Sequence, residues 1–454
     1  MSEPFPLLNT SADQLHSNGI SHPPKPYRRH PRRSSALGGD IRAGDTAPAL
    51  ATSRLSLKAV DASGTPASPS FATVVTTKDG KRVSRRRKLG LVSRIRHTMV
   101  KHTFVLPLTI IALFGLVYSV NPTPSNPVHR FIFLSYELPE SFNDEHGRKH
   151  YGKGLWDLAF VAFYTVVLSF TREFVMQEII RPLGRRAGLG KNKIARFMEQ
   201  VYTAVYFSFL GPFGMYVMSF TPVWYFNTRG MYETYPHKTH DAQFKFYYLF
   251  QAAYWAQQAI VLVLGMEKPR KDYKELVGHH ITTLTLIGLS YRFHFTYIGI
   301  AVYITHDISD WFLATAKTLN YLDSPILIPF FTIFMGAWIY LRHFINLKII
   351  WSLFTEYRTV GPFLLDWEGG QYKCLLGQVI TSTLLICLQA LNLFWLFYIV
   401  RIAYRMVAHN VAEDDRSDDE DEDEDETTEA KPKTNGHAVQ NGTNGSAKNG
   451  SAKN

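Results

Sequence analysis

Long apolar runs in the middle of the chain constrain its fold more than any other feature. A helix needs about 20 mostly apolar residues to cross a hydrocarbon core about 30 Å thick. Between Thr103 and Arg405 such runs follow one another, separated by more polar connections. We predict eight transmembrane helices, at 103–120, 155–174, 200–219, 243–265, 279–296, 297–318, 326–352 and 375–404. The chain is therefore expected to be an all-α polytopic membrane protein.

The fifth and sixth runs form one apolar region that is interrupted only between Tyr291 and His294. We expect a tight reversal of the chain at this interruption, because a loop of about 2–5 residues is enough to join two antiparallel helices. The reversal separates the fifth span from the sixth.

The two ends of the chain differ from the middle in composition. Residues 1–101 are rich in Ser, Pro, Gly and basic residues and lack the apolar periodicity of a packed core. Residues 409–454 begin with an acidic block and end in an Asn, Gly, Ser and Lys tract. We expect both ends to be disordered and residues 102–408 to hold the fold. Ser417 lies directly before acidic residues and is a candidate phosphorylation site, although a solvated acidic tail is the plainer interpretation.

Basic residues in the connections predict how the helices are oriented, since short cytoplasmic loops are enriched in Lys and Arg. They gather before the first run, between the second and third runs, and between the fourth and fifth. The connections at 121–154, 220–241 and 352–372 carry more aromatic, Pro and acidic residues instead. We therefore expect these connections to face the lumen and both termini to lie in the cytosol.

Several ionisable residues lie inside the predicted spans, where each costs about 3 kcal/mol. His279 and His280 begin the fifth run, and His306, Asp307 and Asp310 lie in the sixth. His306 and Asp310 are four residues apart and share a helix face, whereas Asp307 is rotated away by about 100°. Any one of these residues taken singly could serve only as a hydrogen bond between helices. Together they indicate a polar cavity, for which the seventh run adds two further wall candidates, Arg342 and His343.

Two kinds of chemistry use such residues. A histidine near a carboxylate can act as a general base, and an imidazole can also attack a carbonyl and carry an acyl group. Both roles suit acyl transfer. Histidine and aspartate also bind metals, but the HxxxH and HxxHH boxes typical of membrane di-iron enzymes do not occur in the membrane zone. Cys374 and Cys387 suggest neither a disulfide framework nor a zinc site. We expect no metal.

Parts of residues 278–320 resemble the Lag motif of ceramide synthases. The matching stretches run from Gly278 to Thr283, Tyr291 to Gly299, Thr305 to Asp310 and Leu313 to Asn320. Three later stretches resemble the fungal branch of that family, at 358–362, 392–397 and 401–405. The resemblance covers roughly residues 100–408.

This resemblance implies a fold and a reaction. The fold is a TLC domain, in which six or more helices form a barrel around an elongated lipid cavity. The reaction transfers a fatty acyl group from acyl-CoA to the amine of dihydrosphingosine or phytosphingosine, giving a ceramide and free CoA in the endoplasmic reticulum membrane. It needs no cofactor, since acyl-CoA is a substrate.

The resemblance also implies roles for particular residues. The essential histidine pair corresponds to His279 and His280, and the other catalytic residues to His306, Asp307 and Asp310. One histidine is expected to deprotonate the sphingoid ammonium or carry the acyl group, while one of the two aspartates sets its tautomer. Basic residues just before the pair could attract the phosphates of CoA, although setting the topology is the plainer role for them. They are Arg270, Lys271 and Lys274.

Partners and alternatives complete the expectations. Besides the two substrates and the lipids of the endoplasmic reticulum, the family resemblance implies a small single-span regulatory subunit or a second protomer. We expect no nucleic acid partner, because the transmembrane runs contradict a nuclear role for the basic N-terminal blocks. The alternative function is a non-catalytic TLC-domain lipid sensor or transporter, whose polar cavity binds a lipid without reacting.

Overall fold

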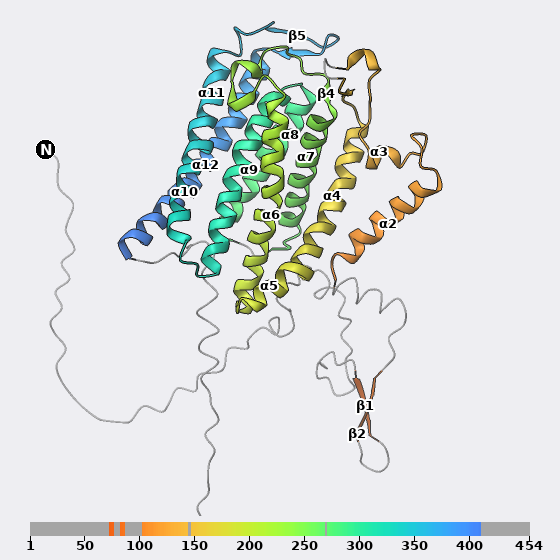
Figure 1. Cartoon of the computed structure of the whole chain (residues 1–454), viewed down its shortest axis with the longest axis vertical. Coiled ribbons are helices and arrows are strands. Elements are labelled where there is room, and N and C mark those ends of the chain that lie inside the picture. Colours follow the sequence, from red (N-terminus) through yellow and green to blue (C-terminus); the bar gives the residue numbers. More distant parts are fainter. Residues whose placement is uncertain (1–71, 77–81, 87–101, 144–146, 268–269, 410–454) are drawn as a thin grey trace, which may run out of the picture. The chain divides into compact units, whose positions relative to one another are not determined.

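The computed structural model describes residues 72–76, 82–86, 102–143, 147–267 and 270–409, and long helices dominate it (Figure 1). The α-helices are α2 (Val105–Val120), α3 (His129–Ile132), α4 (Trp156–Phe174), α5 (Arg181–Arg186), α6 (Lys191–Ser219), α7 (Ala242–Val263), α8 (Tyr273–Arg292), α9 (Thr296–Tyr321), α10 (Leu327–Trp338), α11 (Asn346–Thr355) and α12 (Leu375–His409). Two π-helical segments, η3 (Val175–Ile180) and η6 (Ile339–Ile345), connect α4 to α5 and α10 to α11.

Short strands form three antiparallel pairs among the described residues. β1 (Ala72–Thr76) pairs with β2 (Arg82–Arg86), β3 (His150–Tyr151) with β4 (His240–Asp241), and β5 (Leu364–Asp366) with β6 (Gln371–Lys373). β1 contains the β-branched run Thr73 to Thr76, which favours a strand. The rest of the N-terminal region expected to be disordered lies outside the described residues. The acidic tail with Ser417 lies outside them as well.

Each of the eight predicted spans coincides with a helix of the structure. Four helical segments are long and apolar enough to cross a membrane, namely Trp156–Arg186, Lys193–Ser219, Leu327–Thr355 and Leu375–Met406. α2 is apolar but shorter. α7, α8 and α9 carry more polar side chains, many of which point inward, so a hydropathy criterion alone does not single these helices out.

The predicted reversal between the fifth and sixth spans is confirmed. α8 ends at Arg292 and α9 begins at Thr296. His294 has a φ of +66°, which is uncommon outside glycine and turns the chain sharply. The hydroxyl of Tyr235, from a distant connection, donates to the carbonyl of Phe293 at 2.9 Å and so braces the turn.

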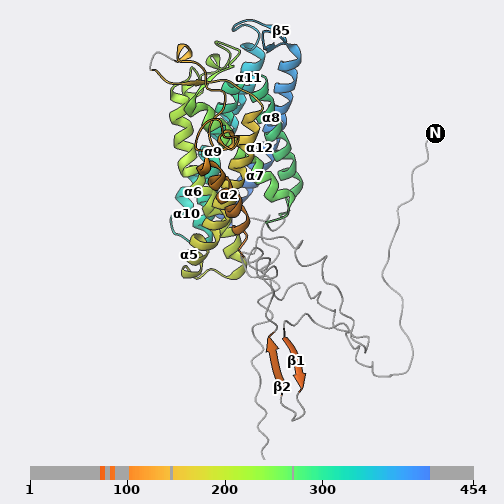
Figure 2. The same cartoon turned by 90° about the vertical axis from the view of Figure 1, so that its right-hand side faces the viewer.

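The connections predicted to share one side of the membrane gather at one end of the helices, here called the hairpin end (residues 121–154, 220–241 and 352–374; Figures 1 and 2). β3 and β4 join the first two connections. The hydroxyl of Tyr235 also accepts from the backbone N–H of Tyr372 at 3.1 Å, which ties the second connection to the third. The opposite end, here called the basic end, carries α5 and the connection between α7 and α8.

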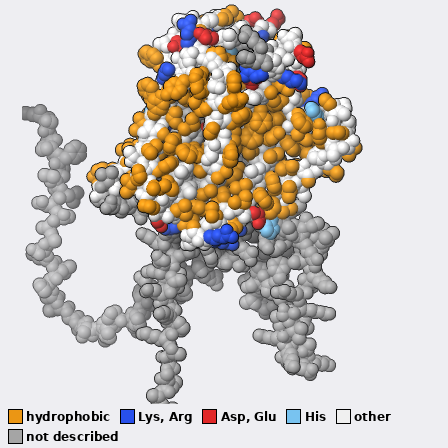
Figure 3. Space-filling view, in the orientation of Figure 1, with side chains coloured by type: hydrophobic (Ala, Val, Ile, Leu, Met, Phe, Trp, Pro, Cys, Tyr) orange, Lys and Arg blue, Asp and Glu red, His pale blue; other side chains and the backbone are white. Residues whose placement is uncertain are grey.

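The outer surface suits a lipid environment. Figure 3 shows hydrophobic side chains over the middle of the helices and charged side chains toward the two ends. Phe209, Trp351 and Phe397 are 71%, 68% and 62% exposed, which is unusual for large apolar residues of a water-soluble protein. The described chain is thus mostly helical, with an apolar surface over the helices.

Candidate functional site

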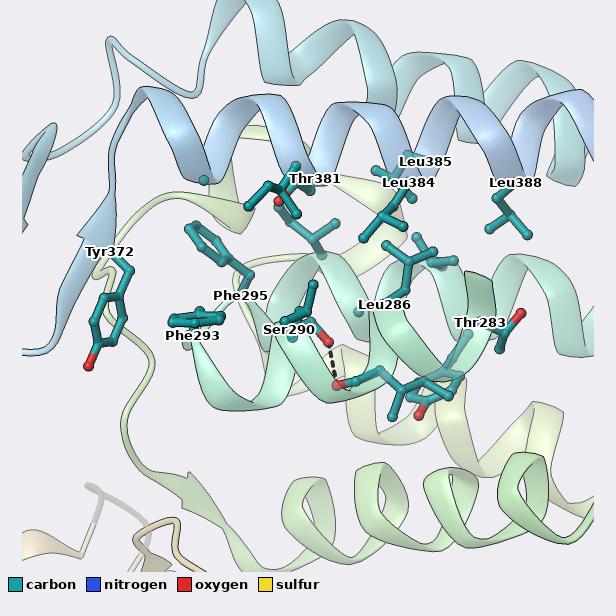
Figure 4. A pocket seen from close by; sticks show the side chains of 18 of the residues that line it. Thr283, Leu286, Ser290, Phe293, Phe295, Tyr372, Thr381, Leu384, Leu385 and Leu388 are labelled. Atoms are coloured by element: carbon teal, nitrogen blue, oxygen red, sulfur yellow. Dashed lines mark hydrogen bonds between the residues drawn. The ribbon is translucent and has the colours of Figure 1, made fainter. Parts of the chain in front are cut away.

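Two cavities of opposite character meet inside the helices. The apolar cavity, about 170 Å³, lies between α8, α9 and α12 and ends at the β5–β6 hairpin, where Leu365, Trp367 and Tyr372 line it. Figure 4 shows Tyr372 at one end of this cavity and Thr283 at the other. The polar cavity, about 190 Å³, lies toward the basic end and is lined from α6, α7, α8, α9, α10, η6 and α12.

His279 lies at the junction of the two cavities. Only His279 and Trp255 line both. The His279 ring is 5% exposed and lies between the rings of Trp255 and Trp395, at centroid distances of 5.6 and 5.2 Å. Its Nδ1 atom is buried without a hydrogen-bond partner among the described residues. The side chain is therefore held by packing, and its Nδ1 atom is not engaged by the protein.

His280 is oriented differently from its neighbour. Its Nδ1 lies 2.9 Å from the carbonyl oxygen of Leu276 and donates to it, which leaves Nε2 as the acceptor of a neutral ring. His280 lines the polar cavity only. The two histidines are therefore not equivalent, because successive residues of a helix point about 100° apart.

The tautomer of His306 is set by an amide and not by a carboxylate. Asn392 accepts from Nη1 of Arg342 at 3.1 Å through its Oδ1 atom, and a guanidinium can only donate. The amide nitrogen of Asn392 therefore donates to Nε2 of His306 at 3.2 Å. The Nδ1 of His306 donates to the carbonyl of Val302 at 2.8 Å. Both ring nitrogens are thus committed, and His306 is a neutral imidazole that lines the apolar cavity.

The prediction that Asp307 or Asp310 sets the histidine tautomer is wrong in this structure. Asp307 is fully buried and faces α7, where it accepts from the hydroxyl of Tyr247 at 3.1 Å and from the amide of Gln251. It lines neither cavity. The reason is the rotation of about 100° between Asp307 and its neighbour His306, which turns the carboxylate away from the cavity wall.

Asp310 lies on the cavity side of α9 and pairs with Arg342. Its Oδ1 is 2.5 Å from Nη2 of Arg342, and Nε of the same guanidinium donates to the hydroxyl of Ser309 at 2.6 Å. The guanidinium also lies 4.2 Å from the ring of Trp338. Because the charge of Arg342 is buried, these acceptors and the ring offset its desolvation. Arg342 lines the polar cavity, where the sequence led us to expect a wall residue.

His343 does not reach either cavity, contrary to its prediction as a wall residue. It points toward α12, where Nε2 of Gln389 donates to its Nδ1 at 2.7 Å. Asn346 donates to the other end of the same amide at 2.8 Å. This buried network joins η6 to α12. His343 therefore serves as a hydrogen bond between helices.

Of the three basic residues that precede the histidine pair, one lines a cavity and two do not. Arg270 lines the polar cavity and lies 3.5 Å from a carboxylate oxygen of Glu199. Although burial opposes it, Glu199 and Glu267 raise the pKa of Arg270 above its usual range, so it stays charged. Lys271 and Lys274 are exposed and line neither cavity. Lys317 lines the polar cavity and was not predicted.

The sequence analysis missed three further groups of the site. Asn392 lies in a stretch that resembles the fungal branch, but its polar side chain within an apolar span was the signal that could have singled it out. Thr283 and Tyr303 line the apolar cavity, and each carries a buried hydroxyl without a partner among the described residues. Only the arrangement of α8 and α9 reveals that these residues line the cavity.

Comparison with known proteins identifies the family of the chain. Residues 196–401 match the family described as the TLC domain. The chain is 51% identical over 353 residues to a sphingosine N-acyltransferase-like protein of Gibberella moniliformis, a match that covers 75% of this chain and 88% of that protein. It is 47% identical over 354 residues to a sphingosine N-acyltransferase of Schizosaccharomyces pombe, covering 77% and 90% of the two chains. It is 45% identical over 342 residues to a ceramide synthase of Saccharomyces cerevisiae, covering 74% and 81%. The chain therefore belongs to the TLC-domain sphingosine N-acyltransferases, or ceramide synthases, and is an acyltransferase.

Proposed function

We propose that this enzyme transfers a fatty acyl group from acyl-CoA to the amine of a sphingoid base, dihydrosphingosine or phytosphingosine, and that His279 is the reacting imidazole. The observation that carries the proposal is the position of His279 at the junction of the two cavities, with its Nδ1 atom unpaired among the described residues. His306 has both nitrogens engaged, and His280 lines only the polar cavity.

The two cavities match the two halves of acyl-CoA. The apolar cavity suits the fatty tail, and the polar cavity, with Arg270, Lys317 and Arg342 in its wall, suits the phosphates of CoA. The thioester carbon then lies between them, beside His279. No carboxylate contacts either nitrogen of His279 in the described part of the chain, so a protonated ring has no anionic partner there. A general base becomes a full imidazolium and is usually oriented by a carboxylate, so the absence of one favours the role of nucleophile.

The proposed reaction has two steps. A ring nitrogen of His279 attacks the thioester carbon, and the C–S bond breaks as CoA leaves as a thiolate that takes up a proton. The neutral amine of the sphingoid base then attacks the acyl carbon, and the bond between carbon and imidazole breaks. The attacking nitrogen loses one of its two protons to water at the polar cavity and keeps the other in the amide, so this proton balances the one taken up by the thiolate. Acyl-CoA supplies an activated thioester, so we propose that no metal or cofactor takes part.

The membrane arrangement follows from the charge of CoA. We propose that the basic end and both termini lie in the cytosol and that the hairpin end lies in the lumen of the endoplasmic reticulum. All eight predicted spans then cross the membrane. Six of them surround the cavities, an arrangement supported by the lining residues that α6, α7, α8, α9, the α10–η6 segment and α12 each contribute. We also propose that a single-span subunit or a second protomer binds this enzyme. Binding measurements on the purified protein test this.

An acid quench tests the proposal directly. Purified enzyme is mixed with radiolabelled acyl-CoA in the absence of a sphingoid base, denatured, digested and analysed by mass spectrometry. The expected result is an acyl group on the peptide that contains His279, absent in His279→Ala, together with loss of ceramide formation by that variant. Ceramide formation that survives in His279→Ala contradicts the assignment. A lipid sensor or transporter, the second candidate, predicts no acyl peptide and no ceramide from the native protein.

A further inference from the structure

Two residues that line the apolar cavity carry buried hydroxyl groups without a partner among the described residues. They are Oγ1 of Thr283 and the phenolic oxygen of Tyr303, and neither has a hydrogen-bond partner in the part of the chain that the structure describes. Tyr303 is 5% exposed and is held by the ring of Tyr248 at a centroid distance of 5.1 Å. Both residues line the apolar cavity, and both hydroxyls are buried polar groups whose hydrogen-bonding capacity is unused.

Their positions relate them to the reacting histidine. Thr283 follows His279 by one turn of α8, which places it about 6 Å further along the same helix face. Tyr303 precedes His306 by three residues on α9 and lies on the same side of that helix. Because the tight reversal makes α8 and α9 antiparallel, the two hydroxyls lie on facing helices, on the apolar side of His279.

Some other hydroxyls in and near this cavity are satisfied within the protein, although Thr381 of α12, which also lines it, makes no hydrogen bond among the described residues. Ser290 and Tyr248 bond each other, as the dashed line in Figure 4 marks. The hydroxyl of Thr285, on the outer face of α8, donates to the carbonyl of Ile281 at 2.7 Å. A buried hydroxyl without a partner carries its full desolvation penalty. Valine and phenylalanine would line an acyl channel at positions 283 and 303 without that penalty, so a purely fatty occupant does not explain the two hydroxyls.

We infer that Thr283 and Tyr303 bind the hydroxyl groups of the sphingoid base and thereby select it over simple long-chain amines. This inference rests on the proposed role of His279. A sphingoid base is a 2-amino-1,3-diol, so its C1 and C3 hydroxyls are on the two carbons next to the amine carbon. An amine directed at an acyl group on His279 therefore places both hydroxyls within about one helical turn of it. A site built to bind a substrate hydroxyl discriminates strongly against an analogue without one.

The test compares three amines of equal chain length: dihydrosphingosine, the analogue without the C1 hydroxyl, and the 2-aminoalkane without either hydroxyl. kcat/KM is measured for the native enzyme, Thr283→Val and Tyr303→Phe. We expect each variant to lose roughly 10-fold in kcat/KM for dihydrosphingosine. The preference for dihydrosphingosine over the 2-aminoalkane should fall by the same factor, and Thr283→Ser should restore it.

Control variants distinguish recognition of the substrate hydroxyls from a general disturbance of the cavity. Thr285→Val removes a hydroxyl from the outer face of α8 and should leave the preference unchanged. Equal loss on all three amines assigns the hydroxyls to the acyl group or to the structure and overturns the inference, as does no loss on any amine. His279→Ala tests the proposed function separately, because it should abolish turnover of every amine, whereas the two hydroxyl variants should change the ratios between amines.

Discussion

Two substitutions of Asn392 test the two hydrogen bonds that this side chain makes. Its Oδ1 accepts from Arg342, and its amide nitrogen donates to His306. Asn392→Leu keeps a similar volume and removes both bonds, so a buried guanidinium nitrogen and a buried ring nitrogen lose their partner. Each loss costs roughly 1–3 kcal/mol, and we expect the free energy of unfolding to fall by about 3 kcal/mol. The melting temperature should fall by several degrees.

Asn392→Asp changes the chemistry with less effect on stability. The carboxylate keeps the acceptor for Arg342 and gains a charge-assisted bond, but it offers no donor to His306. His306 must then donate from Nε2, so its Nδ1 loses the proton that bonds to Val302 in the native enzyme. A histidine in the wrong tautomer can lose activity even where its geometry is kept. We expect a near-native melting temperature and at least a roughly 10-fold lower rate of ceramide formation.

The assay combines initial rates of ceramide formation from acyl-CoA and labelled dihydrosphingosine with thermal melting of the same detergent-purified samples. Gln378→Leu serves as the matched control, since this buried amide of α12 bonds to Leu353 and Arg358, away from the cavity histidines. The control should lose stability and keep its rate per folded molecule. A native rate for Asn392→Asp across the pH range refutes the tautomer argument, and a native melting temperature for Asn392→Leu refutes the energetic one.

Three further predictions concern other parts of the molecule. Asp307→Ala leaves the hydroxyl of Tyr247 without its acceptor and removes one of the two acceptors of the Gln251 amide, so the free energy of unfolding should fall by about 2 kcal/mol. An unchanged kcat per folded molecule would support a structural role, and a large loss of kcat would restore Asp307 to the chemistry. Arg270→Ala and Lys317→Ala should raise KM for acyl-CoA several-fold, because both residues line the polar cavity. The effect should be larger at low salt, where charges are screened less. Lys274→Ala, at an exposed position, is the control, and an equal rise in KM there would contradict the assignment. Burial and the nearby charge of Lys245 lower the pKa of Lys153, in the connection before α4, to about 7. Between pH 7 and its ordinary pKa of about 10.4 the unfolded chain binds more protons at this group than the folded chain does, so stability should rise with pH in that window. Lys153→Met should flatten the rise in melting temperature from pH 7 to 9, and equal slopes would show that another group is responsible.

The sequence predicted the helices well because apolar runs and turn positions are local properties. All eight runs became helices, and the reversal occurred at His294 as expected. Sequence alone did not show which inward polar groups share a cavity. His343 and Arg342 are adjacent, yet one contacts Gln389 in a helix interface and the other lines the polar cavity. Their difference depends on the π-helical turn of η6 and on the neighbouring helix, which no single segment encodes.

The same reasoning explains why the histidine pair contains two different residues in function. Adjacent positions on a helix diverge by about 100°, so although both rings line the polar cavity, only His279 also reaches the apolar one. In α8 the first ring lies between two tryptophans at the boundary of the cavities, while the second is held by the carbonyl of Leu276. A reaction that joins a charged carrier to a fatty chain needs its nucleophile where the polarity changes. Of the two histidines, only His279 lies at that boundary, which supports the proposal that His279 reacts while His280 shapes the polar cavity.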